Sequence, residues 1–270
     1  MENTHTHDYL IRADECDRHY VIRAASLNNL LQESAGHHGV MLGVGMDALK
    51  PRGLTWMLLR FSLDITRFPR WRDTLRVTTW PSGTRGRLIA TREYAACVPP
   101  DETPILNATS EWGLVDIREQ RITRLTDEIR ALRIPAETPP TPAQPRIPEL
   151  DPSAIGLHPP GFFLARSYPV RESQIDFNQH VNNSHYIAWI FDTLPARLAT
   201  GQLSRLDIAY RLPANIGDTL RVETLFNPED HACLHAIRRE SDSALLIHAR
   251  TKWEPAREDA ARSPGAAFGE

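Results

Sequence analysis

The pattern of apolar and polar positions divides the chain into segments typical of strands and of helices. From residue 206 to residue 212 every second side chain is apolar, which predicts a strand with one face turned to a core. From residue 27 to residue 35 the apolar positions follow helical spacing, with Ser26 placed to cap this helix and the glycines from Gly36 to Gly45 to end it. Strands are predicted at residues 9–12, 54–66, 74–80, 88–97, 106–116, 162–168, 203–212, 219–226, 232–239 and 244–253, and a second helix at about 182–199.

The same order of elements occurs twice, and short words of sequence repeat with it. Leu63-Asp64-Ile65 is echoed by Leu206-Asp207-Ile208, and the segment 73–77 by the segment 218–222, at an offset of roughly 143 residues. Several matches in the same order indicate duplication. A strand, a helix and then antiparallel strands, present twice, predict an α+β fold of the tandem (double) hotdog type, with two antiparallel sheets each wrapped around a central helix.

A proline-rich segment separates the two halves. Nine of the 21 prolines of the chain lie between residues 135 and 160, where too few backbone N–H groups remain to build a sheet. The sequence therefore predicts an N-terminal hotdog at 1–134, an extended linker at 135–160, a C-terminal hotdog at 161–255 and a disordered tail at 256–270.

Charge and composition restrict the function. The net charge of −3 and the pI of about 6.4 argue against nucleic acid as the main partner, since phosphate binding normally requires a basic excess. No apolar run approaches the roughly 18–20 residues that cross a bilayer, and the polar N-terminal segment does not resemble a secretory signal. These features predict a cytoplasmic protein. Cys16, Cys97 and Cys233 are far apart and indicate neither a disulfide framework nor a structural zinc site.

The strongest candidate for a reactive site is a group of three side chains just before the second helix. Asp176, Asn178 and His180 bring an acid, an amide and an imidazole to alternate positions. If the segment is extended, the three side chains project to one side, because alternate side chains of a strand share a face. The helix start at Asn182 and Asn183 adds free backbone N–H groups and a positive dipole end, which would stabilise a developing oxyanion.

Other interpretations of these residues remain open. The segment can also be an Asx-rich turn into a capped helix, in which Asp176 and Asn178 bond to the backbone. A metal site formed by Asp176, His180 and His185 is less favoured, because no second cluster supplies ligands. Ser184 is better placed to cap the helix than to act as a nucleophile, because the chain has no GxSxG-type elbow.

The first half contains a pair of histidines but lacks the acid-amide-imidazole pattern of the second. His37 and His38 are interpreted as a surface pair near a glycine-rich helix end. Ahead of its helix the first half has no DxNxH pattern, and the stretch taken to correspond is Arg23-Ala24-Ala25-Ser26. The sequence thus predicts that one half of the duplicated chain performs the chemistry.

The segment 176–190 closely resembles the signature of the plant and bacterial acyl-acyl carrier protein (acyl-ACP) thioesterases. Further stretches at residues 30–35, 54–71, 73–80 and 121–125 also look like that family, in order and at similar spacing, so that the resemblance covers most of residues 9–255. It implies an enzyme without cofactor or metal that hydrolyses fatty acyl-ACP thioesters and so ends chain elongation. It further implies that Asp176, Asn178 and His180 are catalytic and that the first half supplies most of the acyl-chain tunnel.

The resemblance also implies a partner, an acyl carrier protein that presents a fatty acyl phosphopantetheine thioester. No nucleic-acid or membrane partner is expected, and the chain is expected to be a monomer or a homodimer. Arginines that offer a basic patch to an acidic carrier lie at positions 67, 70, 72, 85 and 87.

One departure from the family pattern keeps alternatives open. The family usually has a Glu, in plants followed by a Cys, where this chain has Pro213 and Ala214. An acyl-CoA thioesterase, a 3-hydroxyacyl dehydratase and a non-catalytic module that binds acyl groups or the carrier are therefore the alternatives. Within a hydrolase, either His180 and Asp176 deprotonate a water, or Asp176 attacks the carbonyl itself and forms an anhydride.

Overall fold

A computed structural model describes residues 3–135, 144–148, 150, 162–194, 202–227 and 231–254. The predicted tail at 256–270 and most of the predicted linker at 135–160 lie outside these residues. The strands are β1 (His5–Leu10), β2 (Leu54–Ile65), β3 (Thr74–Arg85), β4 (Ile89–Val98), β5 (Asp101–Asp116), β6 (Arg121–Thr123), β7 (Phe162–Pro169), β8 (Gln202–Tyr210), β9 (Thr219–Asn227), β10 (Ala232–Arg239) and β11 (Leu245–Glu254). The α-helices are α1 (Ala24–Met41), α2 (Met46–Leu49), α3 (Asp127–Arg130) and α4 (Asn183–Asp192), and the 3-10 helices are η1 (Ala13–Glu15), η2 (Lys50–Arg52) and η4 (Glu172–Gln174).

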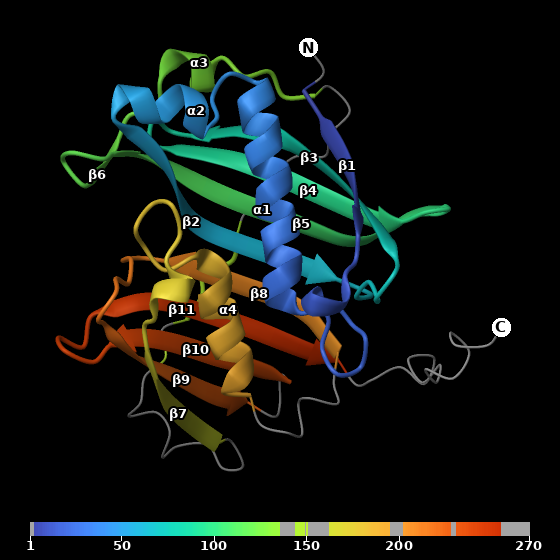
Figure 1. Ribbon diagram of the computed structural model, residues 1–270, viewed down its shortest axis with the longest axis vertical. Helices are drawn as coiled ribbons and strands as arrows, with labels where there is room; N and C mark the ends of the chain where they lie inside the picture. Colours follow the sequence, from blue (N-terminus) through green and yellow to red (C-terminus); the bar gives the residue numbers. More distant parts are fainter. Residues whose placement is uncertain are drawn as a thin grey trace.

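The two halves have the same strand order and meet edge to edge. The first half is ordered β1-β3-β4-β5-β2 and the second β7-β9-β10-β11-β8, and the pairing of β2 with β8 joins them into one antiparallel sheet of eleven strands, with β6 beside β5 (Figure 1). The predicted α+β class is confirmed. The two predicted sheets are joined, because an unpaired β2 or β8 edge would leave a row of backbone groups without partners.

Equivalent residues of the duplicated sequence face each other at this seam. Leu63 of β2 lies opposite Leu206 of β8, and the two are 143 positions apart, the offset of the sequence repeat. Beside them Ser62 Oγ donates to Asp207 Oδ1 at 2.7 Å, and both residues are buried. An approximate twofold axis therefore passes through the centre of the β2–β8 ladder.

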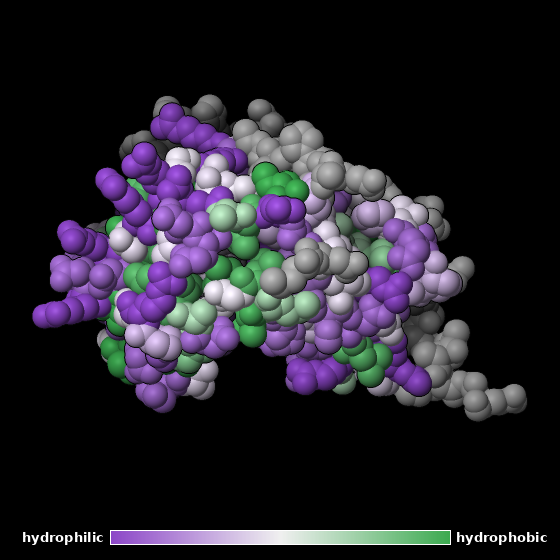
Figure 2. Space-filling model, turned by 90° about the horizontal axis from the view of Figure 1, so that it is seen from above, coloured by the Kyte–Doolittle hydropathy of each residue, from purple (hydrophilic) through white to green (hydrophobic). Residues whose placement is uncertain are grey.

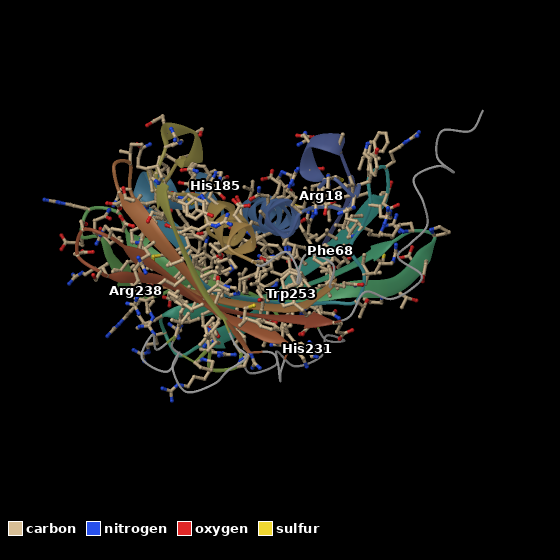
Figure 3. The ribbon with its side chains drawn as sticks, turned by 90° about the horizontal axis from the view of Figure 1, so that it is seen from below. Arg18, Phe68, His185, His231, Arg238 and Trp253 are labelled. Atoms are coloured by element: carbon tan, nitrogen blue, oxygen red, sulfur yellow. The ribbon has the colours of Figure 1, made fainter. Side chains whose placement is uncertain are left out.

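The two long helices lie side by side on one face of the curved sheet, α1 from the first half and α4 from the second (Figure 3). Their buried faces include Leu27 and Leu31 on α1 and Ile187 and Ile190 on α4, all fully buried in one core that spans both halves. No helix among the described residues is long and apolar enough to cross a membrane.

The first helix differs from its predicted bounds at both ends. Ser26 lies inside α1 rather than at its N-cap, which is Arg23, and the helix continues through Gly36 to Met41. Gly39 stays helical because it packs closely on the following loop, where an added Cβ would lie 3.5 Å from the Cα of Gly45. Tertiary packing therefore outweighs the low helix propensity of glycine here.

A piece of the proline-rich segment packs on the outer side of the seam. Gln144 Nε2 donates to the carbonyl of Thr109 at 3.2 Å, and the Arg60 guanidinium donates to the carbonyl of Pro145. Ile147 is buried. Where it is described, the segment is thus part of the packed structure rather than a free tether.

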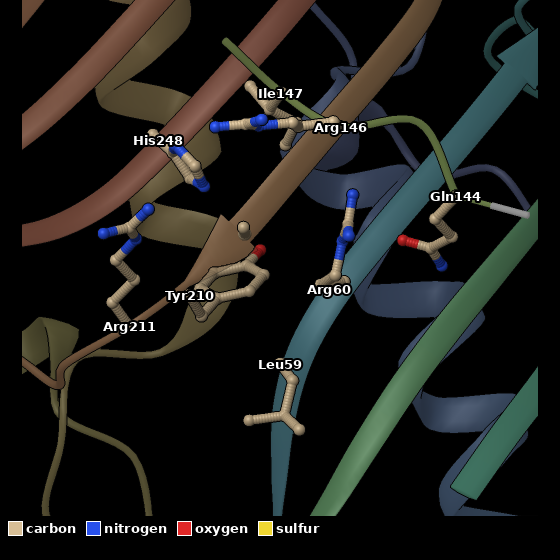
Figure 4. Close-up of a pocket in the computed structure, with 9 residues that line it drawn as sticks. Leu59, Arg60, Gln144, Arg146, Ile147, Tyr210, Arg211 and His248 are labelled. Atoms are coloured by element: carbon tan, nitrogen blue, oxygen red, sulfur yellow. The ribbon is translucent and has the colours of Figure 1, made fainter. Parts of the chain in front are cut away.

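Between this piece and the seam lies a cavity of about 420 Å³ (Figure 4). Its lining residues come from β2, from the end of β8, from β11 and from the proline-rich segment: Leu59, Arg60, Gln144, Arg146, Ile147, Ala209, Tyr210, Arg211 and His248. The cavity opens on the face of the sheet opposite to the two long helices.

We expect Leu63→Ala to lower the free energy of unfolding by about 2–5 kcal/mol, because it leaves a cavity at the centre of the seam. Leu10→Ala is the matched control, since Leu10 is 64% exposed on edge strand β1 and its truncation should change stability by about 0.5 kcal/mol or less. Urea unfolding followed by circular dichroism measures both. Equal unfolding midpoints for the two variants would contradict the role assigned to the seam.

Candidate active site

The segment that contains the three predicted catalytic residues is a tight turn. Asp176 and His180 are joined by the hydrogen bond from the Asp176 N–H to the His180 carbonyl at 2.9 Å, and Ile175 pairs with Val181 as an isolated bridge. Gln179 has a φ of 65°, in the left-handed region. The extended conformation considered from the sequence is therefore not formed, and the alternative, an Asx-rich turn into a capped helix, is the one observed. The reason is local, because Asp176 Oδ1 accepts the Asn178 N–H at 2.7 Å and closes an Asx turn.

This turn changes what the three side chains do. One carboxylate oxygen of Asp176 is occupied by the backbone of its own turn. Among the described residues no hydrogen bond or ion pair joins the Asp176 carboxylate to the His180 imidazole. Both side chains are partly buried, whereas Phe177 between them is 66% exposed.

The first half contains the same turn. Asp17 Oδ1 accepts the His19 N–H at 2.8 Å, the Asp17 N–H donates to the Val21 carbonyl at 2.8 Å, and Tyr20 has a φ of 61°. Asp17 thus matches Asp176 at an offset of 159 residues. The stretch expected to correspond, Arg23 to Ser26, was placed too late in the chain.

The two turns share a frame but not their functional groups. Val21 stands where the second half has His180, and His19 stands where it has Asn178. The carboxylate and the left-handed residue are therefore features of the turn, and the imidazole at position 180 is the feature that distinguishes the second half.

The start of α4 is capped by its own asparagine. Asn182 Oδ1 accepts the Ser184 N–H at 3.0 Å and the Ser184 Oγ–H at 2.8 Å, and the Asn182 N–H donates to the carbonyl of Gln174 at 2.9 Å. The N–H of Asn182 is thus engaged and does not face a ligand. The Asn183 N–H has no acceptor among the described residues, and this asparagine is the member of the predicted pair whose backbone donor is left for a ligand.

Two contacts bring the first half to this turn. Thr55 at the start of β2 donates its Oγ1–H to Asn178 Oδ1 at 3.1 Å, and Asn183 Nδ2 donates to Gln32 Oε1 of α1 at 3.2 Å. Neither Thr55 nor Gln32 was predicted from the sequence. Each is one of several polar residues on its strand or helix, and no local pattern reveals a partner more than 120 residues away.

A shallow depression of about 580 Å³ lies beside the turn. It is lined by Met46 and Asp47 of α2, by Lys50 and Pro51 of η2, and by Phe177 of the turn itself. From the end of the molecule where α2 and α3 lie, hydrophobic surface remains visible between hydrophilic residues (Figure 2). The depression is therefore an apolar recess with charged groups at its border.

The first half is longer than the second between its turn and its seam strand. From Asp17 to Leu63 there are 46 positions, and from Asp176 to Leu206 there are 30. The extra residues include α2 and η2, which follow α1 and reach the turn of the second half. The insertion thus supplies one wall of the site.

The metal set considered from the sequence is not assembled. The described residues do not bring Asp176, His180 and His185 together as ligands. His185 lies within the first turn of α4, 6.1 Å from the ring of Trp189, and burial lowers the pKa of its imidazole. It is therefore a neutral packing residue near pH 7.

Comparison with known proteins agrees with this architecture. The family model of the acyl-ACP thioesterase N-terminal domain matches residues 2–133, and that of the acyl-ACP thioesterase C-terminal domain matches residues 159–255. The chain belongs to the acyl-ACP thioesterase family. The resemblance inferred from residues 176–190 is thereby confirmed.

Named relatives in this family are plant proteins. An acyl-[acyl-carrier-protein] hydrolase of Cuphea viscosissima is 26% identical over 243 residues, which cover 85% of this chain and 57% of the relative. The palmitoyl-acyl carrier protein thioesterase of Gossypium hirsutum is 26% identical over 268 residues, which cover 92% of this chain and 63% of the relative. The chain thus spans about 60% of the length of these curated relatives.

Solved structures of the family share the fold. The 12:0-ACP thioesterase of Umbellularia californica superimposes with a TM-score of 0.81 at 22% identity and covers 95% of this chain and 99% of its own. An acyl-ACP thioesterase of Bacteroides thetaiotaomicron gives a TM-score of 0.76 at 21% identity, with 93% and 98% of the chains covered. These likenesses confirm the double hotdog fold.

Where the family pattern expects a Glu, in plants followed by a Cys, this chain has Pro213 and Ala214, and the backbone of Ala214 is braced by two hydrogen bonds. The Ala214 N–H donates to the Tyr186 hydroxyl oxygen at 2.9 Å, and the Ala214 carbonyl accepts the Val181 N–H at 3.0 Å. Ala214 is fully buried, and burial raises the pKa of the Tyr186 phenol, which stays neutral. The loop after β8 therefore holds the turn in place through its main chain and adds no carboxylate at positions 213 and 214.

The duplicated turn allows a matched test of its scaffold. We expect Asp17→Ala and Asp176→Ala each to lower the free energy of unfolding by about 1–3 kcal/mol, because each removes a charged acceptor of backbone N–H groups. Asp17→Asn and Asp176→Asn should recover most of this stability, since an amide oxygen can close the same turn. Chemical unfolding of the four variants measures the effect, and asparagine variants as unstable as the alanine variants would contradict it.

Proposed function

We propose that the chain hydrolyses fatty acyl-ACP thioesters to free fatty acid and carrier thiol, and so terminates fatty acid synthesis. Membership of the acyl-ACP thioesterase family supports this activity. The observation that carries the proposal is the hydrogen bond from Thr55 to Asn178, which joins the turn of the second half to the edge of the apolar recess. One chain thereby combines polar reactive groups with an apolar surface for an acyl thioester.

In this proposal His180 is the general base. Its imidazole takes a proton from a water, the water oxygen attacks the thioester carbonyl carbon, and collapse of the tetrahedral intermediate breaks the C–S bond. The leaving thiolate takes this proton from the His180 imidazolium, which gives the carrier thiol and restores the base. A thiolate is a good leaving group, so a base of ordinary strength is sufficient.

Asp176 and Asn178 position the reacting groups. Asp176 holds the turn, and with it His180, through its bond to the Asn178 N–H. The Asn178 side chain accepts from Thr55 and directs its amide hydrogens to the water or the carbonyl. The hydrogen bond between the halves thus orients the amide.

The developing oxyanion is stabilised at the start of α4. The Asn183 N–H and the positive end of the helix dipole supply this stabilisation, and Asn182 contributes as the cap that fixes the helix start. Of the two asparagines predicted to bind the oxyanion, only Asn183 is assigned a backbone donor for it, because the Asn182 N–H donates to the carbonyl of Gln174.

The substrate enters along the recess of the first half. Met46 and Pro51 offer apolar contacts to the acyl thioester, and we propose that the first half holds most of the acyl chain. Lys50 at the border attracts an acidic carrier protein. Arg85 contributes less, because it is paired with Glu111 at 2.6 Å, so the arginines at positions 67–72 are better candidates for the carrier surface.

We also propose the domain division given by the sequence, with hotdogs at 1–134 and 161–255, a linker at 135–160 and a tail at 256–270. The cytoplasmic location and the monomeric or homodimeric state stay predictions. Size-exclusion chromatography with light scattering measures the oligomeric state of the full chain.

A non-catalytic acyl-binding module is the second candidate, favoured by Pro213 in place of the family's Glu. A panel of saturated acyl-ACP, saturated acyl-CoA and 3-hydroxyacyl thioesters separates the candidates. Thiol release from saturated acyl-ACP supports the proposed thioesterase. Binding without thiol release supports the module, and turnover of the 3-hydroxyacyl thioester alone supports a dehydratase.

We expect His180→Ala to reduce kcat by about 10²–10⁴-fold, the range for loss of a general base. Asp176→Asn should reduce kcat while the turn stays folded, and Asp17→Asn, at the equivalent place in the first half, should leave turnover unchanged. Thiol release from acyl-ACP measures activity, and thermal melting verifies folding. Unchanged activity in His180→Ala would contradict the assignment of the base.

The water mechanism is favoured over attack by Asp176, because one oxygen of that carboxylate is engaged in the turn. Single-turnover hydrolysis in oxygen-18 water is expected to place the label in the fatty acid and leave Asp176 unlabelled. Mass spectrometry of the peptide that contains Asp176 measures this, and label found in the peptide would establish the anhydride route instead.

A further inference from the structure

Three histidines that are separated in sequence meet on the outer side of the first half. His5 and His7 lie on β1 and His37 on α1, and their candidate ligand nitrogens all lie within 4.8 Å of one another. His5 and His7 are two positions apart on a strand, so their side chains share a face. Strand β1 runs beside α1, which brings His37 to that face (Figure 1). The group lies outside the site described above.

An acidic group lies beside the cluster, next to His37 and outside the set of three mutually close histidines. Glu33 precedes His37 by one helical turn, and its Oε1 lies 2.9 Å from His37 Nε2. The side chains of His37 and Glu33 are 49% and 62% exposed, so an ion from solvent can reach them. Three imidazoles and one carboxylate form a set of four potential ligands on two rigid elements.

His5 forms the inner side of the cluster. Its Nε2 is buried and has no hydrogen-bond partner among the described residues. A buried ring nitrogen without a partner is costly unless a ligand satisfies it.

His38 belongs to the support of the cluster and not to its ligands. Its ring stacks on His5 with 5.8 Å between centroids, and its Nδ1 lies 3.0 Å from the buried guanidinium of Arg92. The interpretation of His37 and His38 as a surface pair is therefore wrong. The two adjacent histidines face different surroundings, because successive residues of a helix are about 100° apart.

We propose that His5, His7 and His37, with Glu33 as the fourth ligand, bind a divalent transition-metal ion of the Zn²⁺ class. Imidazole nitrogens favour zinc, copper and nickel, whereas magnesium and calcium favour oxygen ligands. In a tetrahedral zinc site with Zn–N distances of about 2.0–2.1 Å, ligand nitrogens are about 3.4 Å apart. In the structure the ligand nitrogens of the three histidines lie within 4.8 Å of one another. Rotation of the exposed side chains of His7, His37 and Glu33 would bring the ligand atoms to the shorter spacing of a zinc site.

The proposed ion has a structural role. Four protein ligands leave no open position for a reacting water, which distinguishes structural from catalytic zinc. Strand β1 is at the end of the sheet, and among the described strands it pairs with β3 alone. A bound ion would tie this edge strand to α1 and stabilise the folded first half, since a ligand that binds only the folded state raises its stability.

The test uses the full chain without any added histidine tag, dialysed against a chelator and titrated with ZnCl₂ by calorimetry. We expect one zinc ion per chain, and at least a tenfold weaker affinity in His7→Ala and in His37→Ala. His231→Asn is the matched control, because His231 is exposed directly before β10 of the second half (Figure 3) and its carbonyl accepts the Trp253 N–H, so the zinc affinity of this variant should be unchanged.

Two further readouts distinguish a built site from weak surface binding. Co²⁺ in place of zinc should give the intense visible absorption of tetrahedral coordination, and zinc should raise the melting temperature of the wild-type chain but not of His37→Ala. Absence of binding overturns the proposal. Binding that persists unchanged in His7→Ala and His37→Ala, or an octahedral Co²⁺ spectrum, also overturns it.

Discussion

The backbone ladder between β2 and β8 is the constraint on which the rest of the molecule depends. Each of these strands would be an open edge in an isolated half, and each finds its partner in the other half. The ladder fixes the two halves in register, with Leu63 opposite Leu206. Because Thr55 lies on β2 itself, the same register determines where it meets the turn of the second half. The seam thus determines both the fold and the geometry of the site.

The turn ahead of each helix shows how a scaffold and its chemistry are separated. In both halves an aspartate closes the turn and a residue in the left-handed region completes it. This backbone geometry is local, and it forms whether or not a reactive side chain follows. The imidazole at position 180 and the amide at position 178 are additions to a frame that the chain builds twice.

Much of the fold was predictable from the sequence, because alternation of apolar residues and repeated words report local and duplicated structure directly. The strands near 206–212 and 219–226 and the α+β class follow from those signals. The shape of the turn was not predictable from periodicity, since the Asp176 carboxylate competes with extended structure for the backbone N–H groups. Thr55, Gln32 and the meeting of His5 with His37 depend on tertiary packing, and no local pattern reports it.

The unequal lengths of the two halves determine how many reaction centres the chain has. A symmetric duplication would offer two equivalent clefts, but α2 and η2 extend from the first half over the turn of the second. The chain therefore has one proposed site, although its sheet has an approximate twofold axis. In the proposed site the turn at Asp17 takes no part in the reaction, and the first half contributes surfaces for the substrate and for the proposed ion.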